Sequence, residues 1–412
     1  MRKGLFTRGY VYSVINLLAL HVGPYLLLSV ISVYAMALTG SNTLAGVMTS
    51  VFPLAGLAGR FLAAWLLGRM LPKRVTVVAT AMLVAASAAY LACDNYPLAF
   101  MLRGAQGLGY SMAVTSLSTH IVDILAPDVR LEGIGYSSLT NTLCSVFGPM
   151  LAFSILGPNV DRFLPLFACV LVASSVALFM AIFSKDAQHT ARAKESGEAD
   201  TAGEAVPWVA ALLPVALLAA VSFAQSASSS FLSLFAIDKG FEGIGLYFTL
   251  NAVGVFASRF VMGRIVDALG DRMTVSASIA LVALSTLGIA SAGSAGMLYA
   301  VAVPFGFAIG MLQPVVNAHV VAIMPESKSG TANALFYAAG DVGFITGPVV
   351  WGAVAQTASY EAMFVAAAAV VGACAAFSLF CGFNGRRPTK SEEVESRDVP
   401  TLVANELEED LI

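Results

Sequence analysis

Charged residues are scarce in this 412-residue chain. Asp, Glu, Lys and Arg make up 11% of it, 58% of its residues are hydrophobic, and its mean hydropathy is +0.82. Soluble domains carry about 25% charged residues, and a chain of this length with so few charges cannot cover a globule with solvated surface. The composition excludes an ordinary soluble domain and indicates an exterior that faces lipid.

Motifs of soluble chemistry are also missing. The sequence contains no phosphate-binding loop, no nucleophile elbow, and no paired Cys or His at metal-ligand spacing. Its five cysteines and four histidines are scattered, and its basic residues do not form the stripe of a nucleic-acid-binding face. We therefore expect no enzyme activity, no metal, no cofactor and no nucleic-acid partner.

Long apolar runs are present instead. Segments of about 20 apolar residues, enough to cross a hydrocarbon core of about 30 Å, recur along the whole chain. We expect twelve membrane-spanning helices, which start near Tyr10, Leu44, Val75, Leu98, Gly133, Phe163, Trp208, Gly243, Met273, Met297, Gly330 and Ala362.

The two halves of the chain are copies of each other. An offset of 199 residues maps Arg60 onto Arg259. The same offset pairs His120 with His319, Gly148 with Gly347, and Pro149 with Pro348. A duplicated set of membrane helices is typical of carriers whose site lies between two related bundles.

Two polar segments divide the chain. We expect a six-helix bundle in residues 1–183, a cytoplasmic linker in 184–206, a second six-helix bundle in 207–383, and a disordered cytoplasmic tail in 384–412. The linker and the tail are too polar to bury a core of their own.

The distribution of basic residues indicates the orientation. Under the span assignment, only Arg162 and Lys239 fall on one side of the membrane. Arg60, Arg103 and Arg259 lie within spans, which leaves seventeen of the 22 Lys and Arg residues on the other side. The positive-inside rule puts that basic side, with both termini, in the cytoplasm. We expect a multi-pass monomer in the lipid bilayer of the cell (cytoplasmic) membrane.

A loop segment in each half resembles a motif of the major facilitator superfamily, and the resemblance covers the chain apart from its linker and tails. Residues 263–272, GRIVDALGDR, are similar to the superfamily's cytoplasmic loop motif G-x-L-x-D-R-x-G-R-R. In the first-half equivalent, residues 64–74, Gly68 stands where the motif has its acid and Leu71 where it has its turn glycine.

Two helix motifs complete the resemblance. Residues 103–109, RGAQGLG, are similar to the R-x-x-Q-G-x-G motif of proton-coupled members. The fifth and eleventh spans resemble the span-5 motif of antiporters, although Cys144 replaces the leading glycine of the first copy. The matching residues of the two copies are Gly148, Pro149, Gly343, Gly347 and Pro348.

The resemblance implies an all-α membrane protein with the major facilitator fold, in which twelve transmembrane helices form two pseudo-symmetric six-helix bundles. It implies a secondary active transporter that moves a small organic solute by alternating access. The motifs favour proton-coupled export by antiport. Proton-coupled uptake of a small metabolite by symport is the alternative, and a non-transporting membrane sensor or scaffold is a third reading.

The loop motif predicts a cytoplasmic gate. A carboxylate at the end of the eighth span can bind the positive N-terminus of a neighbouring helix, and the superfamily fold puts Asp267 beside the start of the fifth span near Gly133. Gly68 cannot make the equivalent contact, so we expect an asymmetric gate. Its residues are Asp267, Gly263, Gly270 and Arg272, with Arg60 and Arg259 as supports that snorkel or pair with the loop acids rather than contact substrate.

Polar residues within spans are the candidates for the transport site. On the fourth span, Arg103, Gln106 and Tyr110 share one helical face. An arginine stranded in hydrocarbon costs at least about 2.5 to 3.5 kcal/mol, so such a residue usually faces a bundle interior or a watery cavity. The superfamily resemblance puts this span on the cavity. The alternative is that Arg103 snorkels to the outer interface.

Asp341 lies near the midplane of the eleventh span and shares a face with Asn333 and Tyr337. Burial favours the protonated form of a carboxyl group, which suits a proton carrier that loads on one side and unloads on the other. A structural acid, hydrogen-bonded to a neighbouring span, is the alternative.

Two further spans carry candidates. His21 shares a stripe of the first span with Tyr25, and it is either a pH-sensitive ligand contact or a hydrogen-bonded packing residue. On the seventh span, Gln225 lies beside a seam of small hydroxyl side chains, namely Ser222, Ser226, Ser229 and Ser233. We expect the seam to pack against another helix, with lining of the cavity as the alternative.

Overall fold

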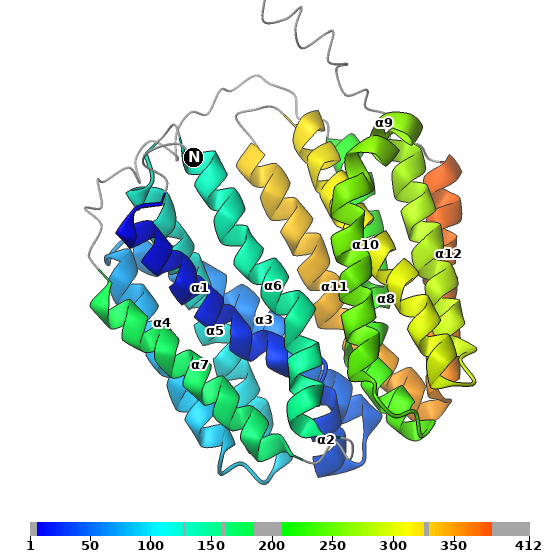
Figure 1. The fold of residues 1–412 in the computed structure, drawn as a ribbon, viewed down its shortest axis with the longest axis horizontal. Helices are drawn as coiled ribbons and strands as arrows, with labels where there is room; N and C mark the ends of the chain where they lie inside the picture. Colours follow the sequence, from blue (N-terminus) through cyan, green and yellow to red (C-terminus); the bar gives the residue numbers. More distant parts are fainter. Residues whose placement is uncertain (1–5, 127–128, 158–161, 185–207, 325–328, 381–412) are drawn as a thin grey trace, which may run out of the picture.

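The computed structural model describes residues 6–126, 129–157, 162–184, 208–324 and 329–380, and these residues form twelve α-helices and no strand (Figure 1). The helices of the first half are α1 (Arg8–Leu27), α2 (Ile31–Thr39), α3 (Asn42–Leu67), α4 (Pro72–Tyr90), α5 (Tyr96–Ile124), α6 (Arg130–Leu156) and α7 (Phe163–Phe183). Those of the second half are α8 (Trp208–Asp238), α9 (Gly245–Ala290), α10 (Ala295–Ile323), α11 (Ser329–Thr357) and α12 (Tyr360–Phe380). The expected linker, apart from Ser184, and the expected tail lie outside the described residues.

The first expected span is broken into two helices. α1 contains Pro24, which lacks the N–H that a helix interior uses, and the helical pattern stops at Leu27 and resumes at Ile31. Within the break, the backbone oxygen of Ser29 accepts a hydrogen bond from the Ser233 hydroxyl at 3.1 Å. The break therefore supplies a polar contact between the two halves.

The eighth and ninth expected spans are the two parts of α9, two helices that meet at Gly270. α9 has 46 residues, and Gly270 interrupts it with φ 76° and ψ 165°. Glycine adopts such a backbone without steric cost. In the first half, the repeat-equivalent Leu71 has φ −62°, and α4 begins at Pro72. The turn between the two spans is thus made by glycine in one half and by proline in the other.

The lengths and the exterior of the helices fit a membrane. Nine helices of the described part are long and apolar enough to cross one by length and composition, and α9 is long enough to do so twice. Large apolar side chains cover the outside: Phe61 and its repeat partner Phe260 are each 72% exposed. An exterior of this kind needs an apolar environment.

The two halves repeat their helix packing as well as their sequence. A Cβ added to Gly107 would clash with the backbone oxygen of Phe52, so α5 contacts α3 without an intervening side chain. The residues 199 positions later, Gly306 and Asn251, make the same contact between α10 and α9. The duplication therefore extends from the sequence to the packing of the helices.

The bundles touch at the end of the molecule where α2 lies, opposite the start of α1 (Figure 1). There the side-chain oxygen of Asn42 accepts a hydrogen bond from the Tyr360 hydroxyl at 2.6 Å, and its backbone N–H donates to Gln356 Oε1 at 2.7 Å. A Cβ on Gly46 would clash with the backbone oxygen of Pro348. The backbones of α3 and α11 therefore touch at this end.

A second contact closes the same end on the opposite side of the interface. Phe153 of α6 stacks on Phe248 of α9, with ring centroids 5.5 Å apart and planes 6° from parallel. Gly245, at the start of α9, leaves room for the Phe153 side chain. We call this region, formed by α3 with α11 and by α6 with α9, the closed end.

Candidate substrate cavity

A cavity of about 460 Å³ lies between the two bundles. This volume falls in the range of about 300 to 1,000 Å³ of small-molecule sites. Helices of both halves make its wall, and the lining residues that hydrogen-bond or carry charge include Tyr25, Ser29, Thr49, Arg103, Tyr110, Asn141, Thr142, Ser145, Gln225, Ser228, Ser229, Tyr247, Asn251, Arg259, Gln313 and Asp341. The aromatic lining residues without a polar atom are Phe52, Phe248, Phe305 and Phe344.

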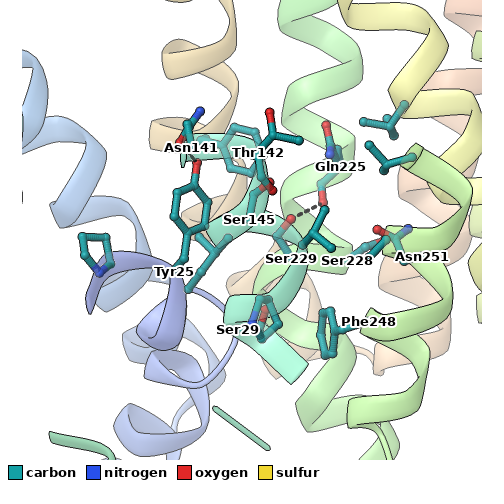
Figure 2. A pocket seen from close by; sticks show the side chains of 18 of the residues that line it. Tyr25, Ser29, Asn141, Thr142, Ser145, Gln225, Ser228, Ser229, Phe248 and Asn251 are labelled. Atoms are coloured by element: carbon teal, nitrogen blue, oxygen red, sulfur yellow. Dashed lines mark hydrogen bonds between the residues drawn. The ribbon is translucent and has the colours of Figure 1, made fainter. Parts of the chain in front are cut away.

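Tyrosines organise the first-bundle wall. Tyr25 of α1 donates its hydroxyl hydrogen to Asn141 Oδ1 of α6 at 2.5 Å, and Figure 2 shows these side chains together on one wall. The Tyr110 hydroxyl lies 2.8 Å from His21 Nδ1. Tyr25 and Tyr110 line the cavity, whereas His21 is buried behind them. The position of His21 favours the second of its two predicted roles, a hydrogen-bonded packing residue.

α8 carries the opposite wall. Gln225, Ser228 and Ser229 line the cavity, and the Ser229 hydroxyl donates to the backbone oxygen of Gln225 at 3.4 Å (Figure 2). Ser228 is 4% exposed, and its hydroxyl has no hydrogen-bond partner in the part of the chain that the structure describes. Buried hydroxyl groups normally have partners, so this wall keeps unused hydrogen-bonding capacity.

The serine seam of α8 divides between packing and lining. A Cβ on Gly343 would clash with Ser222, and one on Gly347 would clash with Ser226. The packing expectation is therefore correct for these two serines, which let α8 and α11 approach closely. Ser229 takes the alternative position in the cavity wall.

The first copy of the Gly-Pro motif has the corresponding packing role. A Cβ on Gly148 would come within 2.9 Å of the Tyr25 backbone, so α6 packs directly on α1. Pro149 then lines the cavity, and its repeat partner Pro348 contacts Gly46 across the bundle interface. In each copy the glycine packs within its own bundle, while Pro149 lines the cavity and Pro348 contacts the other bundle.

Arg103 is buried, with 2% of its surface exposed, and it lines the cavity from α5. Its Nη1 donates to Gln106 Oε1 at 3.3 Å, and its guanidinium carbon lies 4.2 Å from the centre of the Phe52 ring. Nε has no hydrogen-bond partner, and no acidic side chain forms an ion pair with Arg103, among the described residues. The side chain lies in the protein interior and does not snorkel to the interface.

Gln106 does not line the cavity, contrary to the sequence prediction. It is 2% exposed, and its Nε2 donates to Ser87 Oγ of α4 at 3.2 Å. Gln106 lies one helical turn after Arg103, and its side chain points toward α4 of the same bundle. It supports Arg103 from behind.

Asp341 lines the cavity from α11 and forms an ion pair with Arg60 of α3. A second contact of the same pair, from Nη2 to Oδ1, measures 3.5 Å. The two side chains are 21% and 47% exposed, so the pair is partly solvated. Arg60 therefore pairs with an acid of the other bundle and not with a loop acid, because α3 packs against α11.

The other predicted residues divide between the wall and its surroundings. Arg259, predicted to support the gate, also lines the cavity. Tyr337 is 60% exposed and is not among the lining residues, and its ring contacts that of Phe336 with centroids 5.3 Å apart. Asn333 belongs to α11, but its side chain lies outside the described residues.

The predicted latch is not formed in this conformation. Asp267 is exposed and has no hydrogen bond or ion pair with another described residue. The α6 backbone near its start contacts α1 instead, since the Tyr10 hydroxyl donates to the Gly133 oxygen at 2.7 Å. The contact between α6 and α9 that involves Phe153 lies at the closed end, away from the loop motif.

The remaining motif residues have local roles. Gly270 makes the kink of α9, and Arg272 donates to the backbone oxygen of Leu379 on α12. Gly263 lies within helical backbone, and a Cβ there would meet no other atom within 4 Å. The loop motif therefore holds the α9 kink against α12.

Three amide side chains of the wall, Asn141, Asn251 and Gln313, are absent from the sequence prediction. Each is an isolated amide in an apolar span, and this pattern could have identified them as candidate cavity residues. The sequence does not tell which side of a helix such an amide faces, because nearly all faces of these helices are apolar.

Comparisons with known proteins agree with this architecture. The sequence model of the Major Facilitator Superfamily matches residues 14–246 and 240–408. The staphylopine export protein of Staphylococcus aureus is 23% identical over 346 residues, which are 80% of this chain and 84% of that protein.

Solved structures share the fold. A crystal structure of the nucleoside transporter NupG has a TM-score of 0.71 at 12% identity, covering 90% of this chain and 99% of that one. A POT family transporter in complex with a thioalcohol-conjugated peptide has a TM-score of 0.72 at 12% identity, covering 90% and 96%. The predicted all-α membrane fold of two pseudo-symmetric bundles is confirmed.

Proposed function

Because this chain belongs to the major facilitator superfamily and is a transporter, not an enzyme, we propose that it exports a small organic solute in exchange for protons. The observation that carries the proposal is the cavity whose polar wall is shared by both bundles. A site between two bundles that rock against each other is exposed first to one side of the membrane and then to the other. The closed end seals one of these routes here.

The ion pair of Asp341 with Arg60 supports coupling to protons. The carboxylate links α11 to α3, and therefore one bundle to the other. Protonation removes the negative charge and releases this link. A partly exposed pair contributes about 0 to 1 kcal/mol, and 1 kcal/mol changes the ratio of two conformations about fivefold.

Two observations support export as the direction. The Staphylococcus aureus relative is named as an export protein. The Gly-Pro pairs at residues 148–149 and 347–348 resemble the antiporter motif, and Pro149 lines the cavity while Pro348 contacts the other bundle. Antiport follows if protons enter through the cavity as solute leaves.

The orientation and organisation complete the proposal. The excess of basic residues on one side supports cytoplasmic termini in the cell membrane. We propose that residues 1–183 and 207–383 form the two bundles, that 184–206 form the linker, and that 384–412 form the cytoplasmic tail. One chain supplies both walls of the cavity, which supports a monomer as the working unit.

Transport in proteoliposomes tests the function. The purified protein is reconstituted with a pH-sensitive dye inside, and organic anions, cations and neutral compounds are added on either side. We expect an imposed proton gradient to drive solute in the opposite direction to the protons. Movement in the same direction identifies uptake by symport, and absence of solute movement under every imposed gradient overturns the transport proposal.

A further inference from the structure

Two arginines line the cavity from opposite bundles without an acidic partner. Arg103 belongs to α5 and Arg259 to α9, and neither forms an ion pair with an acidic side chain of the described chain. The acid of the wall, Asp341, is already engaged by Arg60. Removing a cation from water is unfavourable unless an anion compensates it, and this cost falls on the buried Arg103, whereas Arg259 is exposed. The described wall therefore has two positive charges that it does not neutralise.

The Arg103 guanidinium is held in place but left partly unsatisfied. The Phe52 ring lies against it at 4.2 Å and Gln106 accepts from Nη1 at 3.3 Å, while Nε has no partner among the described residues. The side chain is 2% exposed, so water does not satisfy it freely. A guanidinium fork matches the two oxygens of a carboxylate. The missing partner has the chemistry of a carboxylate.

The surrounding wall suits the neutral part of an organic molecule. Tyr25, Gln225 and Ser228 offer uncharged hydrogen-bonding groups, and Phe248 offers an aromatic surface. Ser228 has a buried hydroxyl whose hydrogen-bonding capacity is unused in the described chain.

We propose, building on the proposed transport function, that the cavity takes an organic dianion, with one carboxylate bound by Arg103 and the other by Arg259. Such a solute contacts both bundles at once. Its binding therefore favours the conformation in which the bundles approach each other around it, because a ligand shifts an equilibrium toward the state that it contacts better.

A charge series on one carbon skeleton tests this inference. The full-length protein in detergent is titrated with benzene-1,3-dicarboxylate, its monomethyl ester, its dimethyl ester, and the corresponding bis(aminomethyl) dication, and binding is measured by calorimetry. We expect the dianion to bind about tenfold or more tightly than the monoester, since a charge-assisted hydrogen bond is lost. Equal binding of all four compounds, no binding of any, or preference for the neutral or cationic compound overturns the proposal.

Arginine variants connect the binding to the two residues. Arg103→Gln and Arg259→Gln should each weaken dianion binding about tenfold and remove the difference between dianion and monoester. Arg74→Gln is the matched control, since Arg74 is exposed at the start of α4 and does not line the cavity. Arg103→Lys keeps the charge and should retain part of the preference, and it replaces Arg103→Gln if that variant does not fold. Unchanged discrimination in both cavity variants overturns the assignment.

The melting temperature separates anion binding from a structural role. If an arginine is needed for packing, its replacement should lower the melting temperature of the unliganded protein. If it serves to bind the ligand, its replacement should reduce only the rise in melting temperature that the dianion causes. Charge-ranked binding without solute movement in proteoliposomes contradicts the transport proposal alone. Transport of cations and neutral compounds without preference for dianions contradicts the present inference alone.

Discussion

Arg60 of α3 and Asp341 of α11 form an ion pair across the two bundles, although 281 positions separate them in the chain. The contact exists because the duplicated bundles face each other through α3 and α11, which touch through backbone atoms at the closed end. The charge on the Asp341 carboxyl group therefore affects a contact between the two bundles.

Asp341→Asn should abolish transport driven by a pH gradient, because an amide cannot carry a proton between the two sides. Stability should fall by about 1 kcal/mol or less, since the pair is partly exposed. Proton-coupled flux in proteoliposomes and thermal unfolding measure the two effects. Arg60→Gln is the companion variant: it breaks the pair but keeps the carboxyl group, so some proton coupling should persist. Full coupling in Asp341→Asn excludes Asp341 as the proton carrier.

Gly270→Ala should destabilise the protein by about 1 to 3 kcal/mol, because φ at this position is 76° and a side chain there is strained. Gly263→Ala is the control from the same motif. Its backbone is helical and a Cβ would meet nothing within 4 Å, so alanine there should be neutral or stabilising. Chemical or thermal unfolding should show a loss of stability for Gly270→Ala and none for Gly263→Ala, and equal effects would contradict this account of the kink.

Gly46→Ala should open the closed end, because the new Cβ clashes with the backbone oxygen of Pro348 and overpacking costs about 1 to 3 kcal/mol. The measurement is thiol labelling of a cysteine introduced at Ser233, which is 1% exposed in this conformation, in a background without other cysteines. Labelling should become faster. Gly372→Ala on α12 has open space around its Cβ and should leave labelling unchanged. Equal labelling of the two variants argues against backbone contact as the seal.

Tyr110→Phe should destabilise the protein by about 1 to 3 kcal/mol, because it leaves the buried His21 ring without its hydroxyl partner. Tyr136→Phe removes a hydroxyl from a side chain that is 43% exposed, and it should change the free energy of unfolding little. If the two substitutions have equal effects, the His21 contact does not contribute to folding.

Asp267→Asn should leave the stability of this conformation unchanged, because the carboxylate is exposed and has no partner among the described residues. If Asp267 latches onto the start of α6 when the other end of the molecule closes, the substitution should shift the population away from that state. The labelling assay at Ser233 reports the shift as slower modification. Unchanged transport together with an unchanged conformational balance rules out the latch.

The candidate site was only partly predictable, and the reason lies in the chemistry of the spans. Arg103 could be placed in the interior because a charge in hydrocarbon has few other stable positions. Gln106 could not, since an amide is satisfied either by a cavity or by a serine of the next helix, and Ser87 provides the latter. Arg60 and Arg259 were predicted to have the same role, yet one has an acid opposite it and the other lines the cavity.

The sequence by itself determined the membrane environment, the number of spans, the duplication and hence the two-bundle fold, because these follow from apolar length and from a repeat that any reader of the chain can align. Only the tertiary structure decided which polar groups meet. Pairing of Arg60 with Asp341, and of Tyr25 with Asn141, depends on how far each helix is rotated and how the bundles are placed against each other. Helices that are apolar on nearly every side leave that rotation to packing, and small residues such as Gly148 and Gly347 fix it by close backbone contact.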